Sequence, residues 1–98
     1  MNHNYFTYIL TNKNRNVLYT GVTNNLYRRL GEHKDDALGI KKSFTGKYNC
    51  YFLVWFERHQ YILNAIEREK YIKGKSRKWK VDLIEEFNPE WKFLNDEV

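Results

Sequence analysis

The sequence predicts a single domain of the α/β class, α+β type, in which a small three-stranded antiparallel sheet is flanked by helices. Two runs rich in aromatic and β-branched residues, Tyr5–Leu10 and Val17–Thr23, are separated by a polar, asparagine-rich turn and predict a hairpin. A third run, Tyr51–Phe56, is almost wholly apolar. The segments between and after these runs carry apolar residues at helical spacing. The predicted order is therefore β-β-α-β-α-α, over one domain spanning residues 1–98.

The first helix is predicted from Leu26 to about Leu38. The residues before it, Thr23-Asn24-Asn25, offer the short polar side chains that cap a helix N-terminus. Gly39–Asn49 carries several lysines without helical periodicity, so we expect a basic loop there.

The third strand is expected to be central in the sheet, because an almost wholly apolar strand is typically covered on both faces. Helical spacing follows from Tyr61 to about Gly74 and again from Lys78 to Phe87, where Asn88-Pro89 ends the last helix. A three-stranded sheet needs helices packed on it to be stable alone, and this chain supplies them.

The composition fits a small protein with its own core and no disulfide. Of the 98 residues, 17% are aromatic, and such side chains bury a large area each. The single cysteine, Cys50, flanks the apolar third run and is expected to be a buried, unreactive thiol. The N-terminal residues lack the pattern of a signal peptide, and no apolar stretch approaches a membrane span. We therefore expect a soluble, cytoplasmic protein with no membrane association.

The net charge of +5 favours a polyanionic partner, and the basic residues are clustered. One cluster lies in the expected loop, and the other lies around the end of the second helix and the start of the third. Such clusters are either solvated surface or contacts to nucleic acid. The candidate nucleic-acid-binding residues are Lys41, Lys42, Lys47, Lys75, Arg77 and Lys78.

The first helix places two polar side chains on or beside its apolar face. With Leu26 at zero, Leu30 lies at about +40° and Ala37 at about +20° around the helix axis. His33 falls within this stripe, at about −20°, and Arg29 at its edge, at about −60°. We therefore expect both side chains to point inward.

The second helix shows a similar pattern. With Ile62 at zero, Ile66 lies at about +40°, Glu69 at about −20° and Lys73 at about +20°. Glu67 lies at about +140°, on the side expected to face solvent. The pattern thus selects Glu69 over Glu67 as the inward carboxylate.

Inward charged groups are costly unless they are paired or line a polar cleft. One interpretation is a buried ion pair, Arg29–Glu69 or Glu69–Lys73, with His33 buried in the core and its ring nitrogens hydrogen-bonded. The other is a polar pocket between the helices and the sheet. Tyr8 and Tyr19 either pack their rings in the core with their hydroxyl groups in contact with solvent, or they are part of that pocket.

In order and spacing, these residues resemble the GIY-YIG nuclease family, in particular its small single-domain members. The resemblance covers about Tyr5 to Leu94. Phe6, Thr7 and Thr20 replace a glycine and two isoleucines of the two tyrosine motifs. The matching segments are Phe6-Thr7-Tyr8, Tyr19-Thr20-Gly21, Thr23–His33 with its Arg29, Ala65–Gly74 with its Glu69, and Asn88-Pro89-Glu90-Trp91.

The resemblance implies a metal-dependent endonuclease that hydrolyses DNA phosphodiester bonds. Glu69 would bind one divalent metal, Mg²⁺ or Mn²⁺, with water completing the shell. Tyr8 would activate the attacking water, and Tyr19 would orient the water or the phosphate. Arg29 would stabilise the phosphate, and His33 would assist proton transfer or act as the base itself. Supporting roles would fall to Lys73 and Asn88.

Two other functions remain open at this level. The chain could be a nucleic-acid-binding module that keeps the fold without catalysis, or a structural domain whose inward charges are ion pairs. A chain this short leaves no room for a separate DNA-binding domain. DNA affinity is then expected from the basic clusters or from a protein partner, with weak sequence specificity.

Overall fold

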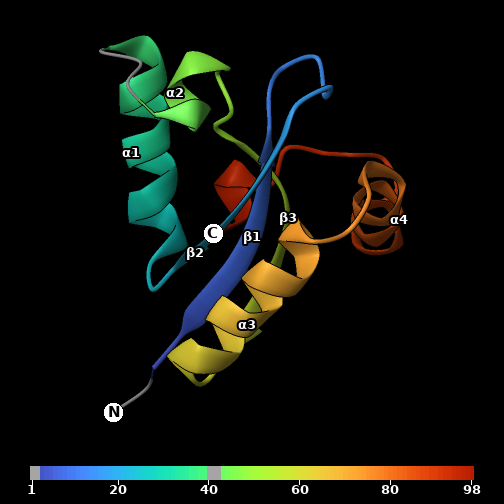
Figure 1. Ribbon diagram of the computed structural model, residues 1–98. Helices are drawn as coiled ribbons and strands as arrows, with labels where there is room; N and C mark the ends of the chain where they lie inside the picture. Colours follow the sequence, from blue (N-terminus) through green and yellow to red (C-terminus); the bar gives the residue numbers. More distant parts are fainter. Residues whose placement is uncertain (1–2, 40–42) are drawn as a thin grey trace.

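The computed structural model describes residues 3–39 and 43–98, and Lys41 and Lys42 lie outside the described residues. The predicted order of strands and longer helices is confirmed, with two short additional elements, α2 and η1 (Figure 1). The elements are β1 (Tyr5–Thr11), β2 (Leu18–Thr23), α1 (Leu26–Leu38), α2 (Phe44–Lys47), β3 (Phe52–His59), α3 (Ile62–Lys73), α4 (Arg77–Phe87) and a final 3₁₀ turn, η1 (Asn95–Glu97).

The sheet has the strand order β2-β1-β3, with both pairs antiparallel. The prediction of a central third strand was wrong, because β1 is central and β3 lies at an edge. The chain's end shields that edge. The Leu94 amide donates to the Leu53 carbonyl at 2.7 Å, and the Asn95 side chain accepts from the Leu53 amide at 2.9 Å. An edge covered in this way tolerates an apolar strand without offering itself for pairing.

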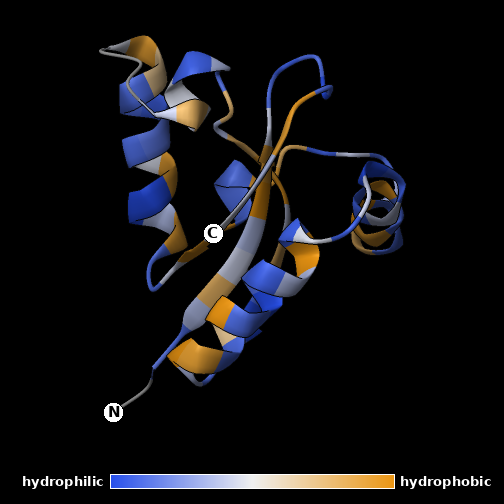
Figure 2. Ribbon diagram, viewed as in Figure 1, coloured by the Kyte–Doolittle hydropathy of each residue, from blue (hydrophilic) through white to orange (hydrophobic). Residues whose placement is uncertain are grey.

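Two hydrophobic cores lie on opposite faces of the sheet, which helices cover on both sides (Figure 1). On one face, Tyr8 and Leu10 of β1 pack with Leu26 and Leu30 of α1. Figure 2 shows hydrophobic residues on the side of α1 toward the sheet and hydrophilic residues on its outward side. The amphipathic pattern of this helix therefore determines which side it presents to β1.

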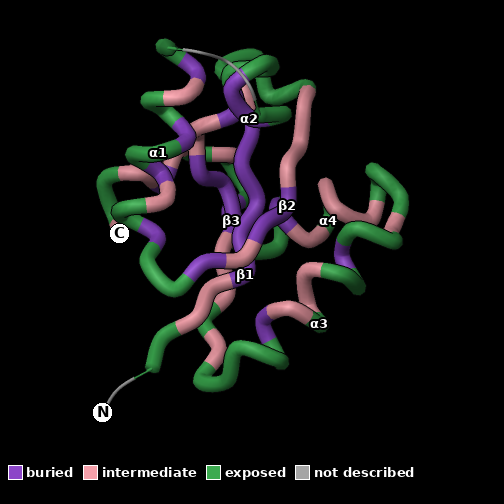
Figure 3. Tube along the Cα trace, turned by 60° about the vertical axis from the view of Figure 1, so that its left-hand side comes forward, coloured by how far each residue is buried: buried purple, intermediate pink, exposed green. Residues whose placement is uncertain are grey.

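On the other face, Ile9 packs with residues of β3, α3 and α4, including Val54, Ile72 and Ile84. The Thr7 hydroxyl donates to the Ala65 carbonyl at 2.8 Å and ties β1 to α3. Much of β1 and β3 is buried in Figure 3, whereas the outward turns of α1 and α3 are exposed. Alternate residues of β1 thus face α1 and α3, and Tyr8 belongs to the α1 side.

The expected loop at Gly39–Asn49 contains a short helix, α2. Ser43 caps it, with its hydroxyl accepting from the Gly46 amide at 3.0 Å. Cys50 follows α2 and is fully buried, as predicted. Burial raises the pKa of its thiol to about 11, which leaves it protonated and unreactive at neutral pH.

Across the described ranges 3–39 and 43–98, none of the helices combines the length and the apolar character needed to span a bilayer.

Candidate functional site

The site begins at a close approach between the two strands of the hairpin. Tyr8 in β1 lies directly opposite Gly21 in β2. A β-carbon built on Gly21 would lie 2.5 Å from the Tyr8 hydroxyl oxygen and 2.6 Å from the ring carbon that bears it. The glycine therefore makes room for the phenol, which is 1% exposed.

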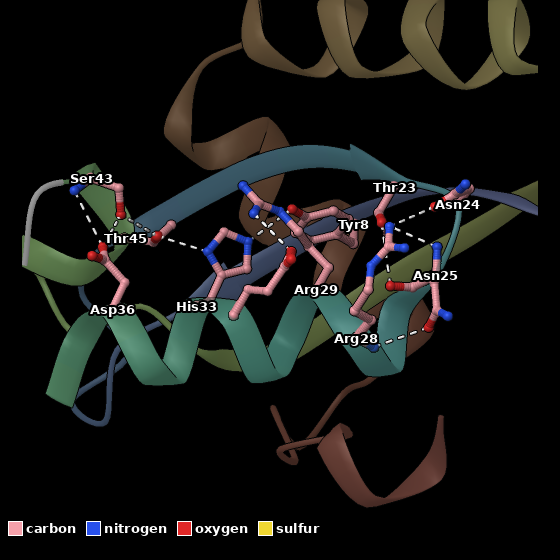
Figure 4. Close-up of polar contacts among 11 residues, drawn as sticks. Tyr8, Thr23, Asn24, Asn25, Arg28, Arg29, His33, Asp36, Ser43 and Thr45 are labelled. Atoms are coloured by element: carbon pink, nitrogen blue, oxygen red, sulfur yellow. Dashed lines mark hydrogen bonds and ion pairs between the residues drawn. The ribbon is translucent and has the colours of Figure 1, made fainter. Parts of the chain in front are cut away.

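The Tyr8 hydroxyl meets both inward residues of α1 (Figure 4). It lies 3.0 Å from Nε2 of His33, and the Arg29 guanidinium donates a hydrogen bond to it. His33 is 3% exposed, and Arg29 is partly exposed at 39% of its side chain. Both side chains thus point toward the buried phenol, as predicted, whereas Arg28 on the same helix is exposed.

These surroundings set the protonation of both groups. Burial raises the pKa of Tyr8 to about 12, with Tyr19 and Glu69 acting in the same direction and Arg29 opposing them. Burial and the positive charge of Arg29 lower the pKa of His33 to about 4. At neutral pH the site therefore holds a protonated phenol and a neutral imidazole.

Behind His33 lies a row of polar side chains from α1 and the start of α2 (Figure 4). Nδ1 of His33 is 2.7 Å from the Thr45 hydroxyl, which is 3.0 Å from the Ser43 hydroxyl. The Ser43 hydroxyl donates in turn to the carboxylate of Asp36. Sequence reasoning missed all three residues. The short α2 shows no periodicity that would single out Ser43 or Thr45, and Asp36 on α1 is recognisable only through its contact with Ser43.

Tyr19 lines the same region with an aromatic stack. Its ring centroid lies 5.6 Å from that of His33 and 6.1 Å from that of Phe44. Lys73 of α3 places its Nζ 6.0 Å from the Tyr19 ring centroid. The partly buried Tyr19 therefore lies between the α1 cluster and α3.

Helix α3 brings Glu69 toward the cluster, but with a different orientation from the one predicted. The helix packs through Ala65 and Ile72, which are fully buried, and Ile62 is 39% exposed. The buried stripe is thus rotated away from Ile62. Glu69 lies at its margin with 21% of its side chain exposed, and Glu67 is exposed as predicted.

The rotation of α3 corrects the position of Lys73. Its side chain is 50% exposed, so the prediction of an inward lysine was wrong. It pairs with Glu69 at 3.5 Å, one of the two ion pairs considered. The other, Arg29–Glu69, is replaced by a pair between Arg29 and Glu32 at 3.3 Å.

The donor set near Tyr8 bears on which metal the site could hold. In the segments that the structure describes, no three His, Cys, Asp or Glu side chains are grouped as metal ligands. Glu69 offers one partly buried carboxylate, close enough to raise the pKa of Tyr8. A single hard oxygen donor fits Mg²⁺ or Mn²⁺, which keep most of their waters, and does not fit a four-ligand zinc site.

The remaining predicted residues make their contacts outside this cluster. The Asn88 side chain donates to the carbonyls of Val54 at 3.1 Å and Lys92 at 2.8 Å, so it fastens the chain's end to β3. Lys75 lies over the Tyr71 ring at 4.3 Å, and Lys78 pairs with Asp82 at 2.9 Å. Arg77 is exposed at the start of α4, and Lys47 lies 5.7 Å from the Tyr48 ring.

The arrangement matches known proteins along most of the chain. Residues 4–82 match the family of the GIY-YIG catalytic domain. Two UPF0213 proteins are each 38% identical to this chain. That of Clostridium perfringens aligns over 81% of both chains, and that of Syntrophus aciditrophicus over 92% of this chain and 98% of its own. The solution NMR structure of a UPF0213 protein from Bacillus halodurans shares 30% identity, with a TM-score of 0.50 over 83% of this chain and 82% of that one.

The matched range, residues 4–82, covers most of the chain and includes Tyr8, Arg29, His33 and Glu69. The chain therefore belongs to the GIY-YIG family of nuclease domains.

Proposed function

We propose that this protein is a metal-dependent endonuclease that hydrolyses DNA phosphodiester bonds with low sequence specificity. The observation that carries the proposal is the contact of the Tyr8 hydroxyl with both His33 and Arg29, at a point where Glu69 is close enough to influence the phenol. In phosphodiester hydrolysis an acid–base pair can activate the attacking water, a cation can stabilise the phosphate, and a carboxylate can hold a metal ion.

Tyr8 and His33 are the proposed proton-transfer pair. The phenol proton passes to Nε2 of His33, which lies 3.0 Å away, and the phenolate then takes a proton from the attacking water. In the free protein the phenol keeps its proton, because its pKa is about 12 and that of His33 about 4. The transfer therefore belongs to the substrate complex, where added positive charge near the hydroxyl favours the phenolate.

Arg29 is the proposed phosphate ligand. Its guanidinium is partly exposed and already bonded to the Tyr8 hydroxyl and to Glu32. A phosphate that accepts from this guanidinium receives charge-assisted hydrogen bonds as negative charge develops on it.

Glu69 is the proposed ligand of one Mg²⁺ or Mn²⁺ ion. Such an ion, when bound, supplies a Lewis acid for the scissile phosphate and the leaving oxygen. Lys73, 3.5 Å from Glu69, balances the carboxylate's charge in the free protein and contacts phosphate in the complex. Tyr19 orients the water or the phosphate, and Asn88 supports the site indirectly by holding the chain's end against β3.

DNA affinity is proposed to come from the exposed residues Lys47, Arg77 and Lys78 and from the partly exposed Lys75. Contacts of this kind bind phosphate and carry no sequence information. A protein partner could add specificity, and we propose that the protein acts in the cytoplasm.

A plasmid-nicking assay with Mg²⁺ or Mn²⁺ tests the proposal. The intact protein is expected to nick and linearise DNA, and Glu69→Ala is expected to abolish cleavage while DNA binding, followed by fluorescence anisotropy, persists. Glu67→Ala is the matched control, because this exposed residue lies on the same helix and faces away. Binding by the intact protein without cleavage would identify a non-catalytic module instead. Loss of cleavage in Glu67→Ala but not in Glu69→Ala would contradict the assignment of Glu69.

A further inference from the structure

In the row of side chains behind His33, the donor and the acceptor of each hydrogen bond can be assigned. We infer that Thr45, held by Ser43 and Asp36, fixes the one proton of the neutral His33 ring on Nδ1 and thereby leaves Nε2 to accept the proton of Tyr8. The inference concerns the free protein, and only its consequence for catalysis rests on the proposed function.

The assignment of donors and acceptors starts from Asp36. An ionised carboxylate only accepts hydrogen bonds, and that of Asp36 accepts from the Ser43 amide at 3.2 Å and from the Ser43 hydroxyl. A serine hydroxyl has a single hydrogen, and this one is therefore used. The Ser43 oxygen can still accept two hydrogen bonds, and it accepts one from the Gly46 amide at 3.0 Å.

The second hydrogen bond to the Ser43 oxygen must come from Thr45. The two hydroxyl oxygens are 3.0 Å apart, and the Ser43 hydrogen already points to Asp36. Thr45 therefore donates to Ser43, so its own oxygen must accept from His33. Nδ1 of His33 lies 2.7 Å from that oxygen, which places the imidazole hydrogen on Nδ1.

A neutral imidazole carries one N–H, so Nε2 is left as an acceptor. The group it faces at 3.0 Å is the Tyr8 hydroxyl, which therefore donates to it (Figure 4). Every hydrogen in the row then points the same way, from Tyr8 through His33, Thr45 and Ser43 to Asp36. A proton arriving on Nε2 creates an imidazolium whose Nδ1–H already points along a row that ends on a carboxylate.

This donor–acceptor order gives Tyr8 and His33, the two candidate bases, different roles. His33 is 3% exposed and both its ring nitrogens are occupied, so it acts on water only through Tyr8. Thr45, Ser43 and Asp36 are positioning residues. Gly46 is required beside them, because a β-carbon there would collide with the Asp36 carboxylate.

Long-range ¹H–¹⁵N NMR on histidine-labelled protein, without DNA or metal, measures the tautomer directly. His33 is expected to show a protonated Nδ1 and an unprotonated Nε2. Thr45→Val removes the hydroxyl while keeping the branched shape. It leaves a buried N–H without an acceptor, which is costly, so the Nε2–H form should become populated. Thr45→Ser keeps the hydroxyl and should restore the original signals. Backbone spectra establish that each variant is folded.

Cleavage kinetics form the second arm. Thr45→Val is expected to lower kcat by at least about tenfold, because a wrong histidine tautomer disables proton transfer. KM for DNA should be unchanged, and Thr45→Ser should recover activity. An Nε2–H tautomer in the intact protein, or a tautomer unchanged in Thr45→Val, overturns the inference. A shifted tautomer with unchanged kcat overturns its catalytic consequence. An intact protein that never cleaves DNA refutes the proposed function instead, while the NMR arm still decides the tautomer.

Discussion

Gly21 lies opposite Tyr8 in the β1–β2 ladder, and its missing side chain is what lets the phenol occupy its place. The phenol cannot easily move aside, because its oxygen is bonded to His33 and Arg29. Gly21→Ala is therefore expected to reduce cleavage by more than tenfold and to destabilise the fold by about 1–3 kcal/mol through overpacking. Urea unfolding and the nicking assay measure the two effects.

Gly31→Ala is the control for this substitution. It also adds one methyl group, but on α1 where nothing lies within 4 Å of the new β-carbon. The alanine should stabilise the helix by up to about 1 kcal/mol and leave activity intact. Equal effects of the two substitutions would show that the close approach at Tyr8 has no special importance.

The buried His33 makes stability depend on pH. Its folded-state pKa is about 4, lowered by burial and by Arg29, with Glu32 and Asp36 opposing. The unfolded value is about 6.5. Between these values the unfolded chain binds more protons, so the stabilising contribution is full above about pH 6.5 and is lost as the pH falls toward 4. The loss amounts to about 3 kcal/mol.

Urea unfolding at pH 7 and at pH 4.5 measures this contribution, with His33→Gln as the comparison. The variant cannot titrate at this position, so its stability should fall less with acid than that of the intact protein. Parallel pH profiles for the two proteins would mean that His33 is not the group responsible.

The sequence located the α1 side of the site because the amphipathic pattern of that helix is regular. Leu26, Leu30 and Ala37 are all buried, so the phase that they define places His33 correctly. The same reasoning gave the wrong orientation for α3. Ile62 is the first residue of the helix and is 39% exposed, so taking it as the centre of the apolar face misplaced that face.

Other features could not be predicted, because they depend on residues that are distant in the sequence. The edge of β3 is shielded by Leu94 and Asn95, some forty residues away from Leu53, and no local pattern in an apolar strand reveals such shielding. Thr45 lies in a four-residue helix that Ser43 caps, and this helix is too short to show a periodicity. Their contacts with His33 and Asp36 depend on how α2 folds back against α1.

Arg29 and Arg28 allow a sharp test of the guanidinium. Arg29→Lys keeps the positive charge but loses the planar fork that bonds Tyr8 and Glu32 together, so we expect cleavage to fall by about ten- to a hundredfold. Arg28→Lys changes a neighbouring, exposed side chain that bonds Asn24 at 2.9 Å, and it should cleave normally. The readout is kcat at saturating DNA. A loss confined to KM would assign Arg29 to substrate binding alone.

Lys47 and Lys78 differ in how much of their charge is available to DNA. Lys78 is paired with Asp82 at 2.9 Å, whereas Lys47 lies on α2, where Phe44 stacks on Tyr19 of the site. Lys47→Gln should therefore weaken DNA binding about equally for unrelated sequences and reduce the slope of log affinity against log salt by about 1. Lys78→Gln should change both quantities less. Anisotropy titrations at several salt concentrations provide the comparison. A larger effect of Lys78→Gln would place the DNA path along α4 rather than across α2, next to the residues that carry the chemistry.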